Sequence, residues 1–167
     1  MKLPVKDNSP LISSGKHLVE ISKVYEDEAG SGETQLAVLF KAVDGDRQIT
    51  KWYNLKGFKK DPESPKTVDE NGRTVDNWLR NKKGDRIEDK DSTNKCMSIL
   101  SQLLFDAGLG EDEDGNSVDT ADTDDLEGCQ LGIFVGDRDT GFGTRTEVKY
   151  TMPASKAYAQ STIDDLI

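Results

Sequence analysis

The sequence predicts a mainly β domain of several short strands and one helix. Apolar and polar residues alternate over short segments, as they do along half-buried strands. One segment near residue 100 instead has apolar residues at helical spacing. Turns rich in Gly and Asp separate these segments, and no apolar run approaches the roughly 20 residues of a membrane span.

The first three predicted strands precede the helix. They cover residues 15–25, 34–43 and 47–55, and the second is apolar enough to lie at the centre of a sheet. Asp44-Gly45 is a hairpin signal between the second and third strands. Residues 1–14 lack periodicity, so we predict an irregular arm there.

The helix has signals at both ends. Asp91-Ser92-Thr93 offers an N-cap and Gly108 offers a stop. The apolar residues at helical spacing are Met97, Leu100, Leu103, Leu104 and Ala107. Two more strands are predicted over 131–135 and 144–151, joined by a glycine-rich loop.

Two long polar stretches lie outside this pattern. Residues 56–90 form an insertion, in which Asn71-Gly72 between Val68 and Val75 predicts a small hairpin. Residues 111–127 hold nine acidic residues and no Lys or Arg. Their spacing does not fit a calcium loop, so we interpret them as a solvated acidic loop.

The order of elements is strand, strand, strand, helix, strand, strand. This is the order of an OB fold, whose helix lies between its third and fourth strands. We therefore predict a five-stranded OB-type barrel over residues 1–153, which includes the insertion and the acidic loop. Residues 154–167 are predicted to form a C-terminal tail.

The net charge of −10 argues at first against a nucleic-acid partner. The acidic loop accounts for nine of the negative charges, and Asp164 and Asp165 add two. Without these eleven charges, the rest of the chain carries a charge of about +1. The remainder is therefore able to present a basic face.

The richest candidate segment for DNA binding is 47–60, which contains five cations, three aromatic residues and no acid. Single strands bind through phosphate neutralisation and base stacking on aromatic rings. Its candidates are Arg47, Lys51, Trp52, Tyr53, Lys56, Phe58, Lys59 and Lys60. Alternation places Trp52 and Tyr53 on opposite faces, so at most one lies on the binding face. A solvated edge strand with two core aromatics explains the segment equally well.

Two further clusters add candidates for DNA binding. The insertion contributes Trp78, Arg80, Lys82 and Lys83, and a tryptophan in a polar loop favours a binding role. The alternative is that Trp78 folds back onto the barrel. The loop before the last strand contributes Phe142 and Arg145, because this loop binds ligands in OB folds. The alternative there is a generic hairpin.

Metal, cofactor and enzyme motifs are not found. With His17 as the only histidine and Cys96 and Cys129 as the only cysteines, the chain lacks the about four ligands of a zinc site. We expect both cysteines to be small buried residues. The sequence has no phosphate loop, nucleophile elbow or paired histidines, so we expect neither an enzyme nor a cofactor. The N-terminus lacks a signal peptide, which predicts a cytoplasmic protein, in the host if it is viral.

Three segments resemble small phage-encoded single-stranded-DNA-binding proteins with an OB fold. They are 15–55, the helix end 103–109, and Leu126-Glu127-Gly128 before the fourth strand. The resemblance implies coating of single strands, without sequence preference, in phage DNA replication or recombination. Residues 163–167 are similar to the acidic tails of replication-type members, although the terminal Pro-Phe of bacterial members is missing. The resemblance thus implies replication or recombination proteins as partners of Asp164, Asp165, Leu166 and Ile167.

A second function fits the same composition. The protein would then be an acidic protein-interaction module, such as a phage adaptor or a DNA mimic that inhibits a host protein. The two functions differ in their response to salt and to DNA. DNA binding weakens steeply as salt rises, whereas a mimic binds a basic host protein and ignores DNA.

Overall fold

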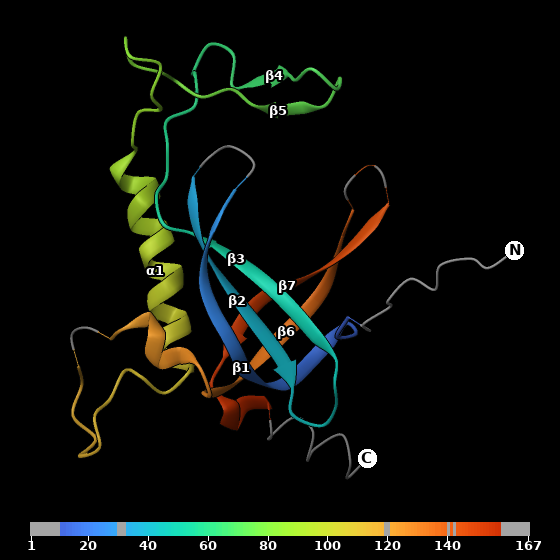
Figure 1. Ribbon diagram of the computed structural model, residues 1–167, viewed down its shortest axis with the longest axis vertical. Helices are drawn as coiled ribbons and strands as arrows, with labels where there is room; N and C mark the ends of the chain where they lie inside the picture. The colour runs from blue at the N-terminus through green and yellow to red at the C-terminus, as the bar shows by residue number, and fades with distance from the viewer. Residues whose placement is uncertain (1–10, 30–32, 119–120, 140, 142, 158–167) are drawn as a thin grey trace, which may run out of the picture. The chain divides into compact units, whose positions relative to one another are not determined.

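Figure 1 shows a computed structural model of the chain, which describes residues 11–29, 33–118, 121–139, 141 and 143–157. The chain folds into two compact units. The larger unit contains Met1–Tyr53 and Ser101–Ile167. The smaller unit contains Asn54–Leu100, and therefore the whole insertion predicted at 56–90.

Within the described residues, the larger unit is built around an antiparallel sheet of five strands in the order β3-β2-β1-β6-β7 (Figure 1). The strands are β1 Gly15–Glu28, β2 Thr34–Ala42, β3 Gln48–Asn54, β6 Gln130–Asp139 and β7 Thr144–Met152. All five predicted strands are confirmed. β1 and β6 continue for several residues beyond their predicted ends.

The long strand β1 joins the two halves of the sheet. Its residues 15–20 pair with β6 and its residues 19–28 pair with β2. An irregularity between Ile21 and Lys23 shifts the register. Beyond Glu20, β1 no longer pairs with β6 itself. It pairs there with the segment just before β6, where Ile21 N donates to Cys129 O at 2.9 Å.

β3 and β7 are the edge strands, and among the described residues no backbone pairing between them closes the sheet into a barrel. A side chain links the two edges instead. Lys51 Nζ on β3 donates a hydrogen bond to Val148 O on β7 at 3.0 Å. Lys51 is two residues from the buried Ile49 and two from the buried Tyr53, so it shares their inner face of the sheet. The sheet therefore curves until its two edges approach each other.

The core of the larger unit lies on the inner face of this sheet. Fully buried side chains include Ile12, Val19, Ile21, Phe40, Leu103, Leu126, Ile133 and Val135. Leu126 ends the short 3-10 helix η1, Thr123–Leu126. Ile12 belongs to the arm predicted at 1–14, whose residue Leu11 bridges to Gln48, the first residue of β3. The sequence did not predict Ile12 as a core residue, because a single apolar position shows no periodicity.

The predicted helix is confirmed as α1, Lys90–Asp106. The cap predicted at 91–93 is wrong. Asp89 is the capping residue, since its Oδ1 accepts a hydrogen bond from Asp91 N at 3.1 Å. The glycine stop is confirmed, because Gly108 follows the helix with a φ of 86°.

Three residues expected in the core are less buried than predicted. Met97 of α1 is exposed, so the buried stripe of the helix is narrower than its sequence pattern. Cys96 and Cys129 are free thiols of intermediate burial. Desolvation by partial burial raises the pKa of the Cys129 thiol, whose Sγ donates to Asp125 O at 3.3 Å.

The smaller unit contains the predicted hairpin. Strands β4, Lys66–Val68, and β5, Thr74–Asp76, pair antiparallel around it (green in Figure 1). Gly72 has a φ of 77°, a conformation that glycine adopts without strain. The Asn71-Gly72 signal is therefore confirmed.

Backbone hydrogen bonds join three extended segments of the smaller unit into a ring. Lys59 N donates to Ile87 O at 2.9 Å, and Ile87 N donates to Leu79 O at 3.2 Å. Leu79 N donates to Lys59 O at 2.9 Å and closes the ring. Each segment thus pairs with both others, which holds the unit together where apolar side chains are few.

The same type of five-residue turn occurs three times in the described chain, at 69–73, 81–85 and 112–116. In each copy, the first side chain accepts hydrogen bonds from the backbone N of the third and fifth residues. The fourth residue is a glycine with positive φ. The second copy presents Lys82 and Lys83 at its tip, whereas the third lies in the acidic loop.

Candidate nucleic-acid interface

Trp52 and Tyr53 point to opposite faces of β3, as strand alternation predicts. Tyr53 is 4% exposed and belongs to the core. Trp52 is 42% exposed and lies on the outer face. The large unit therefore offers Trp52, and not Tyr53, as a ring on which a base could stack.

The indole of Trp52 reaches across the neighbouring strand. Its Nε1 donates to Asp27 Oδ2 on β1 at 3.0 Å, and β2 lies between these two strands. Ala37 of β2 alternates with the inward-facing Leu36 and Val38, yet it is 0% exposed. We infer that the indole covers this small residue, with one ring face on the sheet and the other toward solvent. Base stacking requires such a presentation.

Tyr25 adds a second aromatic ring beside Trp52. The sequence did not predict Tyr25 as a site residue. Tyr25 pairs with Ala37 in the register of β1 and β2, and it is exposed. Lys23 Nζ lies 5.2 Å from the centroid of its ring. Alternation from the buried Ile21 would place Lys23 and Tyr25 on the inner face, but the register shift after Ile21 turns them outward.

Lys51 does not join this outer face, although it was a candidate for DNA binding. Its side chain turns inward, donates to Val148 O, and lies 5.4 Å from the centroid of the Tyr53 ring. Burial lowers the pKa of the Lys51 ammonium group, and the Glu147 carboxylate opposes this shift. Lys51 and Tyr53 are therefore assigned to the seam between β3 and β7.

The hydroxyl of Tyr53 is buried and has no hydrogen-bond partner among the described atoms. Burial raises the pKa of this phenol far above its ordinary value, and the Asp106 carboxylate adds to the shift. In the unfolded chain the phenol ionises near pH 10, at about its ordinary pKa. Folding is therefore opposed by the ionised phenol above about pH 10, and stability falls as the pH rises further.

We expect Tyr53→Phe to remove this alkaline loss of stability. At pH 7 the variant should be at least as stable as the wild type, because an unpaired hydroxyl leaves the core. Urea unfolding at about pH 7 and about pH 11 measures both effects. An equal alkaline loss in both proteins would show that Tyr53 is not the group responsible.

Trp78 packs inside the smaller unit. Its ring meets Phe58 edge to face, with centroids 6.2 Å apart. The guanidinium carbon of Arg86 lies 4.9 Å from the Trp78 centroid and 5.8 Å from that of Phe58. Both aromatic rings are half-buried. Trp78 thus has a packing role that its polar sequence context did not predict.

Lys60 is engaged in the same region. Its Nζ lies 6.0 Å from the Trp78 centroid and 3.2 Å from Asp76 Oδ1. Lys66 pairs with the same carboxylate. The hydrogen bond from Lys66 is the main cause of the lowered pKa of Asp76, and Lys60 contributes. A phosphate would have to compete with Asp76 for Lys60.

The other cations predicted in the smaller unit are exposed. Arg80 Nη1 donates to Gly84 O at 2.8 Å across the turn at 81–85. The remaining four form no ion pair with described residues: Lys56, Lys59, Lys82 and Lys83. Eleven of the chain's 22 Lys and Arg residues lie in this unit, against nine Asp and Glu. The unit therefore carries a positive net charge in an acidic protein.

The remaining candidates do not gather around Trp52. Arg47 is exposed at the turn before β3 and lines a cavity with Asp44 and Asp46. Arg145 is exposed near the start of β7, opposite Arg138. The other candidates, which lie outside the described residues, are Phe142, Asp164, Asp165, Leu166 and Ile167.

The acidic loop is exposed from Glu111 to Val118. Asp112 uses its carboxylate to accept backbone hydrogen bonds within the turn at 112–116. In the part of the chain that the structure describes, no group of three His, Cys, Asp or Glu side chains is placed to hold a metal ion. The loop thus presents negative charge to solvent.

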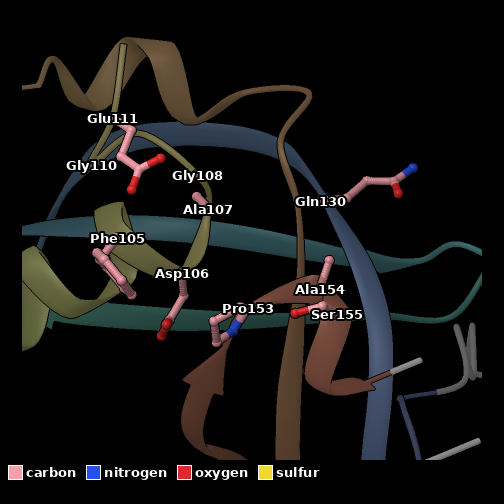
Figure 2. A pocket seen from close by; sticks show the side chains of 10 residues that line it. All are labelled: Phe105, Asp106, Ala107, Gly108, Gly110, Glu111, Gln130, Pro153, Ala154 and Ser155. Atoms are coloured by element: carbon pink, nitrogen blue, oxygen red, sulfur yellow. The ribbon is translucent and has the colours of Figure 1, made fainter. Parts of the chain in front are cut away.

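A cavity of about 540 Å³ lies at the C-terminal end of α1. Figure 2 shows that its walls come mainly from the end of α1 with the loop after it, and from the segment after β7. Among the described residues that line it, Asp106 and Glu111 are the carboxylates, and there is no cation or histidine. Asp106 already accepts hydrogen bonds from Gln102 Nε2 at 2.9 Å and from Thr151 Oγ1. This lining offers no paired acid and base.

No known protein-family model matches this chain. No curated protein matches it either. No helix in the described ranges is long and apolar enough to cross a membrane. The function is therefore inferred from the chemistry of the two units.

Proposed function

We propose that the protein binds single-stranded DNA without sequence preference. The observation that carries this proposal is the exposed indole of Trp52, which reaches across β2 to Asp27 beside the exposed ring of Tyr25. Aromatic rings presented in this way stack bases of any sequence. Lys23 supplies a nearby positive charge for the phosphates.

The fold that we propose is of the OB type. Three features support it: the order of the five strands, the place of α1 between β3 and β6 in the chain, and the link from Lys51 across the sheet edges. In OB folds, the face of the second and third strands binds oligonucleotides. Trp52 lies on β3 and its indole covers β2, so it occupies that face.

The smaller unit supports the same function through charge. Four exposed lysines of this unit are free to contact phosphates: Lys56, Lys59, Lys82 and Lys83. Each contact makes binding more sensitive to salt, so that affinity falls as salt rises. On this proposal, the protein coats single strands in phage DNA replication or recombination. The residues at the C-terminus stay candidates for contacts with replication or recombination proteins.

Tryptophan fluorescence tests the proposal directly. In a Trp78→Phe variant, Trp52 is the only tryptophan of the chain. We expect oligothymidylate to quench its emission as a base stacks on the ring, with a Kd that rises steeply with salt. Trp52→Leu should raise the Kd roughly 5- to 150-fold, which corresponds to one stacked base worth about 1–3 kcal/mol.

Tyr53→Phe is the matched control, because it changes the next residue but leaves the outer face intact. Its Kd for DNA should equal that of the wild type. If the wild type binds no single-stranded DNA even at low salt, the proposal is wrong. Binding to a basic protein without any response to DNA would instead favour an acidic interaction module.

A further inference from the structure

The outer face carries another aromatic pair at the opposite end of β1. The register pairs Lys16 with Phe134, and Phe134 with Tyr150, so these side chains form a row across β1, β6 and β7. The rings of Phe134 and Tyr150 stack with centroids 5.1 Å apart and planes 7° from parallel. Tyr150 is 52% exposed, whereas Phe134 is half-buried. Phe134 thus supports one face of Tyr150.

A bulge in β7 directs Tyr150 outward. Phe134 pairs with Tyr150, but the next residue, Val135, pairs with Val148, so Lys149 is an extra residue in β7. Val148 is buried. In a regular strand Tyr150 would share the inward face of Val148, two residues earlier. Bulges that redirect a side chain are frequent beside functional sites.

A cavity of about 330 Å³ lies beside this ring. Tyr150, Lys16 and Lys156 line it, together with Gln102 and the buried carboxylate of Asp106. Asp106 is already hydrogen-bonded to Gln102 and Thr151. Lys16 and Lys156 are exposed, and neither forms an ion pair with a described residue. The cavity therefore combines a ring with two available positive charges.

We propose that this cavity is a second nucleotide-binding site. A base stacks on the open face of Tyr150, and its phosphate contacts the ammonium groups of Lys16 and Lys156. The charges and the ring match a nucleotide of a single strand, which offers a π-face and an anion at each position. This inference rests on the proposed function, since it extends the path of the same DNA strand.

The two ring sites lie far apart along the sheet. The indole of Trp52 is tied to Asp27 near one end of β1, and Lys16 is near the other end. The length of β1 between these residues is roughly 36 Å, at about 3.3 Å per residue. A short oligonucleotide therefore occupies one site, and only a longer one reaches both.

The test compares oligothymidylates of about 4 and about 16 nucleotides, the limits of the site size of an OB fold. Tyr150→Leu should weaken binding of the longer strand about five-fold or more and change the shorter one less. Tyr150→Phe should keep the affinity because it keeps the ring. Changing both Lys16 and Lys156 to Gln should reduce the salt slope by about 1.4, at about 0.7 for each phosphate contact.

Phe105→Leu is the matched control, because Phe105 is an exposed ring outside both sites. It should leave both affinities unchanged. If the wild type binds neither strand, the proposed function itself fails. If the wild type binds DNA, and the Tyr150 and lysine variants bind both strands as tightly as the wild type does, the second site is wrong. Equal weakening for both lengths would contradict a strand that runs from Trp52 to Tyr150.

Discussion

Reversing the charge of four lysines in the smaller unit should lower the affinity for single-stranded DNA on the order of 100-fold at low salt. The residues to change to Glu are Lys56, Lys59, Lys82 and Lys83. All four are exposed and without an ion pair to a described residue, so each is available to a phosphate. The slope of log affinity against log salt should become shallower by about 2.8, at about 0.7 per contact. Titrations between about 50 and 200 mM salt measure both quantities.

Lys90 and Lys95 provide the control for this experiment. They are exposed lysines of α1 in the same unit, and they lie outside the predicted binding clusters. Changing Lys90 and Lys95 to Glu should lower the DNA affinity less, for each lysine changed, than changing the four lysines does. If the loss per charge is the same, the affinity follows net charge and not the proposed surface. Circular dichroism spectra establish that both variants keep their fold.

Strand alternation predicted more of the proposed binding face than composition did. Composition grouped the five cations and three aromatics of 47–60 as one candidate site. Alternation separates them, because Lys51 shares the inner face with Tyr53 while Trp52 faces outward. The same rule, applied to Lys51 at the start, would have removed it from the candidates.

Tyr25 and Tyr150 were missed for a different physical reason. Both lie beyond register irregularities, one after Ile21 in β1 and one at Lys149 in β7. An irregularity of one residue exchanges the two faces of a strand. The sequence of a single strand does not show where its partner imposes such a shift, so the outward direction of these rings was visible only in the sheet.

The elements set by local signals were predicted well, and those set by distant contacts were not. The five strands, α1 and the Asn71-Gly72 hairpin follow from periodicity and turn residues within short windows. The backbone ring of Lys59, Leu79 and Ile87 joins residues far apart in the chain. It has no periodic signal, and Trp78 and Phe58, whose rings pack together, are the chain neighbours of Leu79 and Lys59 in this ring.

The second prediction with a large effect concerns Gly57, where the first segment of this ring meets the start of α1. A Cβ atom at Gly57 would lie 2.1 Å from Ser92 Cβ and 2.7 Å from the backbone C of Ser92. The backbone of Gly57 is also fixed, because its N donates to Thr93 Oγ1 at 3.0 Å and its O accepts from Asp89 N at 2.9 Å. Gly57→Ala must therefore displace one of these two segments.

We expect Gly57→Ala to destabilise the smaller unit by about 1–3 kcal/mol or more, the usual range for overpacking. Hydrogen exchange measures this loss separately in each unit. Protection should fall at the amides of Lys59, Leu79 and Ile87, and stay high at Ile21 in the sheet. DNA affinity should fall with it, because the exposed lysines lose their fixed arrangement. Gly45→Ala is the control, since a Cβ there meets nothing within 4 Å. Equal loss of protection at Ile21 would show that the two units unfold together, and unchanged protection at Lys59 would show that Ser92 gives way to the added methyl group.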